Sequence, residues 1–246
     1  MTSLLKMRIS KSVVLCFLLF FQSSFVIPVP VESISLDMSA KILNKGKYVA
    51  VSGQVFYKKS GGLMVTKFSK PSESVTITNA NGEMKIYDVK ANTVLQMQGL
   101  DFSSDNSFFY YFLCGKTQDM GLKSTGFKLE STKIEDGMVV TQWVPEKGGT
   151  NELSRIEMVH EKYKPIYMAL YNVQKKVIKK TYYTNYNKIQ DISFPLNITE
   201  FNYDIKGDST ITRRLYSNVK TNKEVDETYL NYKIPSNAKV LAPSKK

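Results

Sequence analysis

The sequence predicts a mainly β protein with a few helices, built as a strongly curved antiparallel sheet or incomplete barrel of roughly 11–12 strands. Three observations lead to this prediction. Short stretches with alternating apolar and polar residues recur along most of the chain, as half-buried strands require. Turn-forming residues separate these stretches at close intervals. The number of stretches is too large for a flat open sheet, so the sheet must curl.

The clearest run of strands lies between Gly53 and Gln98. Met84 and Ile86 would share one strand face, while Lys85 would lie on the other. The turns contain Gly, Asn and Pro, which suit tight chain reversals. We expect strands at Gly53–Lys59, Leu63–Ser69, Ser74–Thr78, Glu83–Asp88 and Thr93–Gln98. A sheet of this kind has one apolar face that it must bury by stacking or by curling on itself.

The first thirty residues have the features of a secretory signal peptide. Three basic residues precede an apolar run from Val13 to Phe21, and a small polar segment follows. A membrane-spanning helix needs about twenty apolar residues, so we expect cleavage and release into the periplasm. An uncleaved signal would instead leave the protein anchored to the membrane.

Residues 31–241 are expected to form one domain, with residues 242–246 as a loose tail. The chain has a net charge of +12, and its first thirty residues carry three positive charges and no acid, so the rest carries 12 − 3 = +9. Solvated Lys side chains explain this charge, and attraction to an anionic surface is the alternative. The basic residues are spread along the chain, which argues against a nucleic-acid partner.

Other elements follow from the same patterns. Residues 32–44 alternate with the period of a strand. Residues 103–115 are the best helix candidate, because Ser103, Ser104 and Asp105 are good N-cap residues and Phe and Leu follow at helical spacing. Further strands are expected at 127–134, 138–144, 152–160, 165–171, 177–186, 196–203, 210–217 and 228–234.

Residues suited to catalysis or metal binding are scarce. Beyond the signal segment the chain has one His, His160, and one Cys, Cys114, which lies among bulky apolar residues and leaves no partner for a disulfide. A metal site would need more ligands than these two can supply. We also find no phosphate-binding loop and no nucleophile elbow. The sequence therefore predicts no catalytic residue, no metal, no cofactor and no enzymatic activity.

Three segments together resemble a known family. Phe56–Asp88 contains a basic pair, a short turn, K-P, a strand, N-G and Y-D; Tyr186–Pro195 ends in F-P; and Tyr229–Val240 joins an apolar stretch to a Pro and a small turn. In this order they resemble the periplasmic outer-membrane lipoprotein carriers (LolA/LolB-like). The resemblance implies a half-open antiparallel barrel with helices across its mouth. The carriers open with an amphipathic helix, whereas residues 32–44 here have a strand's period.

The resemblance also implies an apolar cavity for acyl chains. Met64 and Phe68 match cavity positions of the carriers, and the remaining candidates are apolar residues that an enclosed sheet would turn inward. The candidate cavity residues are Phe56, Met64, Phe68, Met84, Ile86, Leu95, Met97, Phe109 and Phe112. The same residues would also fill a solid core. Lys59 falls where the carriers have an Arg tied to cargo transfer, and Lys lacks the planar fork of Arg.

These features predict a monomeric carrier that binds the acyl chains of lipoproteins and transfers them toward the outer membrane. Its partners would be acylated lipoproteins or lipids, an inner-membrane donor complex and an outer-membrane acceptor. Two alternatives remain open. One is a lipid-sensing regulatory module on the same fold, and the other is a structural protein of the cell envelope with a solid core.

Overall fold

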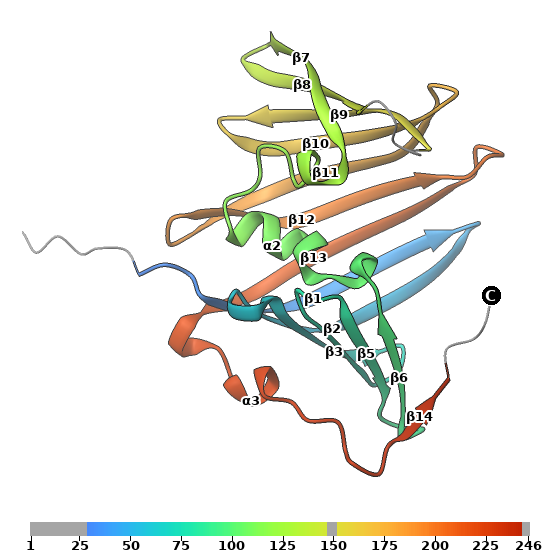
Figure 1. Ribbon diagram of the computed structural model, residues 1–246, viewed down its shortest axis with the longest axis vertical. Coiled ribbons are helices and arrows are strands. Elements are labelled where there is room, and N and C mark those ends of the chain that lie inside the picture. Colours follow the sequence, from blue (N-terminus) through green and yellow to red (C-terminus); the bar gives the residue numbers. More distant parts are fainter. Residues whose placement is uncertain (1–28, 147–151, 243–246) are drawn as a thin grey trace, which may run out of the picture.

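A computed structural model describes residues 29–146 and 152–242, and within these residues one continuous sheet of fourteen strands dominates the fold (Figure 1). Most of the expected signal peptide and residues 243–246 of the expected tail lie outside the described residues. The first strands are β1 (Ser33–Asn44), β2 (Lys47–Lys58), β3 (Leu63–Lys70), β4 (Ser74–Thr78), β5 (Glu83–Asp88) and β6 (Thr93–Gln98). The helix α2 (Phe108–Leu113) separates them from the second half.

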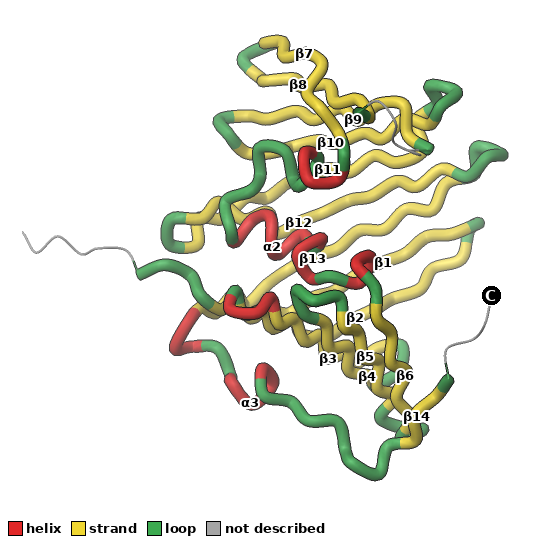
Figure 2. The backbone as a smooth tube through the Cα atoms, viewed as in Figure 1, coloured by secondary structure: helices red, strands yellow, loops and turns green. Residues whose placement is uncertain are grey.

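The second half begins with β7 (Phe127–Glu135), β8 (Met138–Pro145), β9 (Leu153–Glu161) and β10 (Lys164–Asn172). It continues with the long strands β11 (Val177–Ile189), β12 (Ile192–Tyr203) and β13 (Ser209–Thr221), followed by α3 (Glu227–Leu230) and β14 (Lys239–Leu241). Figure 2 shows that strands make up most of the described chain and that the helices are short. The mainly β prediction is confirmed, with a few more strands than expected.

The strand order is β14-β6-β5-β4-β3-β2-β1-β13-β12-β11-β10-β9-β8-β7, so the sheet is curved but does not close into a barrel. Chain neighbours pair as antiparallel hairpins within each half. β1 pairs with β13 and joins the two halves, with Met38 opposite Tyr216. At one edge β14 adds to β6 in parallel.

The turns follow the expected chemistry. In the β7–β8 hairpin, Asp136 and Gly137 have φ values of 50° and 76°. Two successive residues with positive φ form the turn that matches the twist of a tight hairpin, and Asp-Gly is a favoured pair for it. Lys45 and Gly46 turn β1 into β2 in the same way, with φ values of 48° and 76°.

Each face of the sheet carries a hydrophobic cluster. The larger cluster lies on the concave face, where α2 packs against strands from both halves (Figure 1). The smaller cluster lies on the convex face of β2–β6 and includes Phe56, Val75 and Tyr87. The segment after β13 runs across this convex face, and its α3 contacts β2 and β3.

Two expectations about local structure have different outcomes. The alternating segment near the start forms β1, so the described chain opens with a strand where the carriers have a helix. The strand expected at 228–234 is wrong, because α3 occupies its first part. Asp226 explains the difference: its side chain accepts a hydrogen bond from the Thr228 N–H and caps a helical turn, which buries Leu230 on the convex face.

Candidate functional site

Strand register brings six of the predicted cavity residues onto one face of β3–β6. Met64 lies opposite Thr78, Thr78 opposite Met84, and Met84 opposite Met97. The next row carries Ile86 opposite Leu95, and Phe68 lies opposite Ser74. This is the concave face, because Met64 pairs with Tyr57, a member of the concave cluster. We call Met64, Phe68, Met84, Ile86, Leu95 and Met97 the apolar platform.

All six platform side chains are partly exposed. They are therefore not sealed in a solid core, although the residues opposite them on the convex side, such as Val65 and Val94, are buried. Met side chains are flexible and adapt to ligands of different shape. A curved sheet that presents partly exposed Met, Leu, Ile and Phe on its inner face can bind a flexible apolar chain by the hydrophobic effect.

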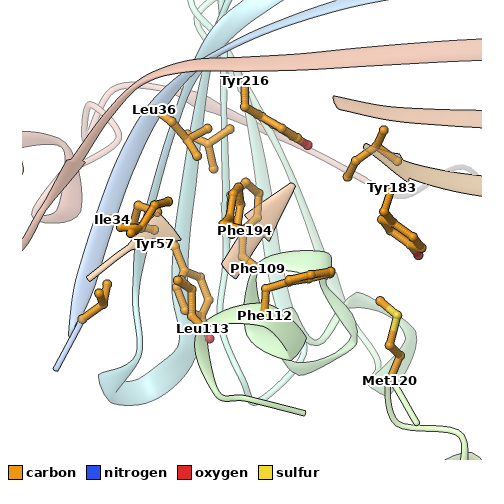
Figure 3. Packing of buried hydrophobic residues seen from close by; sticks show 14 of the residues in the cluster. Ile34, Leu36, Tyr57, Phe109, Phe112, Leu113, Met120, Tyr183, Phe194 and Tyr216 are labelled. Atoms are coloured by element: carbon orange, nitrogen blue, oxygen red, sulfur yellow. The ribbon is translucent and has the colours of Figure 1, made fainter. Parts of the chain in front are cut away.

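The other two predicted residues on the concave side, Phe109 and Phe112, come from α2 (Figure 3). The Ser107 side chain caps this helix by accepting from the Tyr110 N–H. The rings of Phe109 and Phe112 lie with their centroids 5.8 and 5.9 Å from that of Phe194. Both side chains are buried, so α2 fills the centre of the concave side.

The burial of α2 determines how much free energy is needed to move this helix away from the sheet. Fully exposing a large apolar side chain costs about 1.5–3 kcal/mol, and α2 buries Phe109, Phe112 and Leu113. Lifting the helix would therefore cost roughly 5–9 kcal/mol before any ligand is bound. We infer that α2 acts as a fixed plug and that a ligand would lie beside it on the open concave surface.

The ninth predicted cavity residue, Phe56, is on the opposite face, so its placement in the cavity was wrong. Phe56 is buried in the convex cluster, and its ring stacks on Tyr229 with centroids 4.7 Å apart. Its strand neighbours Val55 and Tyr57 point to the concave side instead. The alternation of a strand identifies two faces but does not say which one the sheet curls around.

Phe56 gives a first prediction. Replacing Phe56 with Ala should lower the free energy of unfolding by about 3–5 kcal/mol, because the lost ring leaves a cavity in the convex cluster beneath the C-terminal segment. Acyl binding to the remaining folded protein should not change, since the side chain does not reach the concave face. Urea unfolding and titration with a fluorescent fatty acid would measure the two effects, and a loss of binding without a loss of stability would contradict the assignment.

A second hollow lies beyond α2, over β7–β9, with a volume of about 600 Å³. Its floor includes Trp143, Thr141 and Val139, which alternate along β8 on the concave face. Its rim includes Lys123 and Lys162. This hollow was not predicted from the sequence, because the connection after α2 that borders it has no recognisable periodicity.

His160 lies at the edge of this hollow and is buried. Its Nε2 lies 2.9 Å from the carbonyl oxygen of Thr117, which makes it a hydrogen-bond donor that ties β9 to the connection after α2. The geometry gives His160 a structural contact. Within the described residues, no three His, Cys, Asp or Glu side chains gather as metal ligands.

The concave face also carries a group of charged side chains, Lys179 on β11, Glu200 on β12 and Arg214 on β13. The Lys179 Nζ lies 2.5 Å from Glu200 Oε1, and Arg214 Nη1 donates to Glu200 Oε2. Only 12% of the Glu200 side chain is exposed. Burial would raise the pKa of Glu200, but the two cations outweigh it and hold the pKa below its usual value.

Glu200 should therefore make stability depend on pH. Because its pKa is lower in the folded protein than in the unfolded chain, its contribution is complete above about pH 4.3 and is lost as the pH falls through the folded-state pKa. Urea unfolding between pH 3 and 6 should show a shallower fall in stability for Glu200→Gln than for the wild type. The exposed Glu130→Gln is the control, and a Glu200→Gln curve parallel to the wild type would refute the prediction.

Neither a protein-family model nor a curated protein sequence matches this chain. Solved structures do match it. A DUF1329 family protein from Desulfovibrio piger aligns with a TM-score of 0.57 and 15% identity, covering 81% of this chain and 89% of its own. A domain named as outer membrane lipoprotein-sorting, from Vibrio parahaemolyticus, aligns with a TM-score of 0.56 and 11% identity, covering 81% and 89%. A LolA superfamily protein from Nitrosomonas europaea aligns with a TM-score of 0.53 and 11% identity, covering 82% of this chain and 92% of its own.

The chain has a LolA-like fold. At these identities the likeness establishes the architecture, and the architecture agrees with the curved, unclosed sheet described above. In this LolA-like sheet the concave face holds the apolar platform, α2, the second hollow and the charged group. No helix in residues 29–146 and 152–242 is both long and apolar enough to cross a membrane.

Lys59 lies at the β2–β3 hairpin of the LolA-like sheet, where the sequence comparison expected a basic residue. Its N–H donates to the Glu32 carbonyl at 2.9 Å. Burial raises the pKa of the Cys114 thiol, and the charge of Lys59 opposes that rise. Its part in cargo transfer stays a prediction.

Proposed function

We propose that the protein is a carrier of the cell envelope that binds the acyl chains of lipoproteins on its concave face and passes them toward the outer membrane. One observation carries the proposal: a LolA-like sheet presents six partly exposed apolar side chains in register on its inner face. Such a surface shields acyl carbons from water at about 0.8 kcal/mol per buried CH2 group.

The proposal requires no catalysis. The cargo would move from an inner-membrane donor complex to the carrier and then to an outer-membrane acceptor, in each case by exchange of one apolar surface for another. The predicted signal peptide would deliver the chain to the periplasm as a monomer. The name of the Vibrio parahaemolyticus domain, outer membrane lipoprotein-sorting, supports the same class of function.

The test is native mass spectrometry of the mature protein purified from a bacterial periplasm, followed by analysis of the released ligands. Co-purified acylated protein would support the carrier. Free lipid or fatty acid alone would favour the sensing module over the carrier. A ligand-free mass that does not change when a triacylated peptide is added would refute acyl binding and favour the structural protein.

A further inference from the structure

We propose that Lys179, Glu200 and Arg214 form an anchor on the concave face for the anionic phosphate headgroup of an acyl ligand. The proposal rests on the proposed binding of acyl chains to the concave face and goes beyond the carrier function, because the thioether-linked diacylglycerol of a lipoprotein carries no phosphate. It adds a second class of ligand for the same face, an acyl phosphate ester. Neither the platform nor the sequence resemblance requires such a group.

The charged group shares its face with the apolar interior. Glu200 lies two residues from Ile198 on β12, and Arg214 lies two residues from Tyr216 on β13. Ile198 and Tyr216 both belong to the concave cluster. Since side chains two apart on a strand share a face, Glu200 and Arg214 also point to the concave side.

The aromatic rings of α2 pack next to the anchor, but they leave both of its cations partly exposed. Phe108 stacks on Tyr216 and Tyr183 with centroids 5.8 and 6.4 Å apart. Arg214 lies one row farther along β13, opposite Ala40 of β1, whereas Phe109 packs toward the opposite end, against Tyr57. About 35% of each of the Lys179 and Arg214 side chains is exposed, so both cations can be reached from the open surface.

The charge of the group is unbalanced. Glu200 neutralises one of the two cations, which leaves a net charge of +1 in an apolar setting. A guanidinium has five N–H donors, and the bond to Glu200 uses one at Nη1 of Arg214. The remaining donors suit a phosphate, which binds Arg through short charge-assisted hydrogen bonds.

A purely structural role explains this group poorly. Taking charged side chains out of water costs several kcal/mol per ion, and apolar residues of similar volume often give equal or greater stability. Desolvated charged groups with specific charge partners are concentrated at functional sites. The excess positive charge of this group would attract a negatively charged ligand.

The anchor and the platform lie within one acyl chain of each other. Arg214 faces Ala40 on β1, Ala40 faces Val51 on β2, and β3 with Phe68 is the next strand. Three strand spacings of about 4.8 Å separate β13 from β3, or roughly 15 Å. A phosphate held at Arg214 would therefore let its acyl chain cross β1 and β2 to reach the platform.

The test compares two probes with the same chain, dodecyl phosphate and the uncharged, phosphate-free dodecyl maltoside, by calorimetric titration of the mature protein below their micellar concentrations. The wild type should bind dodecyl phosphate at least about tenfold more tightly than dodecyl maltoside. Arg214→Gln should lose this preference and keep its affinity for dodecyl maltoside. Arg213→Gln is the matched control, because it makes the same charge change at the neighbouring, exposed residue of β13 on the convex face.

Glu200→Gln separates an anchor from a structural ion pair. Removing the carboxylate raises the net charge of the group, so this variant should bind dodecyl phosphate more tightly than the wild type, even though it is less stable. A purely structural ion pair predicts unchanged or weaker binding, which would overturn the proposal. Circular dichroism would establish that each variant is folded before titration.

The remaining outcomes distinguish this inference from the carrier proposal. Equal binding of the two probes by the wild type would overturn the anchor and leave the carrier standing. Binding of neither probe would overturn both. Inorganic phosphate should bind far more weakly than dodecyl phosphate, and equal affinity that depends on Arg214 would identify a site for the free ion and overturn the headgroup assignment.

Discussion

Replacing Leu95 with Asp should abolish acyl binding while leaving the protein folded. Leu95 lies on β6, the outermost strand of the apolar platform, opposite Ile86, and its side chain is partly exposed. A carboxylate there can stay hydrated in the free protein, but a bound acyl chain would strip its water at a cost of several kcal/mol. We expect the affinity for a fluorescent fatty acid to fall at least about a hundredfold.

The chain offers a matched control at the next residue. Gln96→Asp makes the same change of charge, but Gln96 is exposed and lies on the convex face opposite Lys85. It should bind the fatty acid as the wild type does. Equal losses in the two variants would indicate a general electrostatic effect, and no loss in Leu95→Asp would show that the platform does not bind acyl chains.

Replacing Phe194 with Ala should lower the free energy of unfolding by about 3–5 kcal/mol. Phe194 is fully buried, and its ring is within 5.9 Å of the ring centroids of Phe108, Phe109 and Phe112. The cavity left by the ring would lie under α2, where the surrounding sheet cannot easily collapse. Urea unfolding followed by far-ultraviolet circular dichroism would measure the change.

Tyr48→Ala is the control for this prediction. Tyr48 is also an aromatic residue on a strand, but 73% of it is exposed, so its removal should change the free energy of unfolding by less than about 0.5 kcal/mol. A loss of less than 1 kcal/mol in Phe194→Ala would mean that α2 does not pack on the sheet as described.

The sequence was most informative where local chemistry decides the structure. The last four strands between Gly53 and Gln98 were predicted within one residue, because their alternation and turns are local signals. The first was expected to begin at Gly53, but β2 begins six residues earlier, at Lys47. The position of α2 was also predicted, since the spacing of its Phe residues is a local signal. The expected N-cap at Ser103, Ser104 or Asp105 was wrong, because Ser107 caps this helix. The grouping of six platform residues followed from the period of a strand.

Two errors have different physical causes, one a packing partner distant in sequence and the other a local helix cap. Phe56 was assigned to the cavity although it stacks on Tyr229, and no local pattern could show which face the C-terminal segment covers. The strand expected at 228–234 failed because the Asp226 cap outweighed the apolar alternation.

The charged group was missed for a related reason. Lys179, Glu200 and Arg214 lie on three different strands, and each one alone is an ordinary charged residue in a basic chain. Only the pairing of β12 with both β11 and β13 brings the three side chains together. Charges within predicted strands, on faces that otherwise carry apolar residues, were the one signal that could have identified them.

The pairing of β1 with β13 also governs when the protein can fold. Ile34 on β1 lies opposite Thr221 on β13, so these two strands can pair along their full length only after residue 221 has been synthesised. Contacts so distant in sequence make folding slow, because a long loop must close before they form. Until β13 is available, β1 can pair only with β2, so the two halves of the sheet cannot join and the apolar residues of the concave cluster that come from both halves cannot pack together.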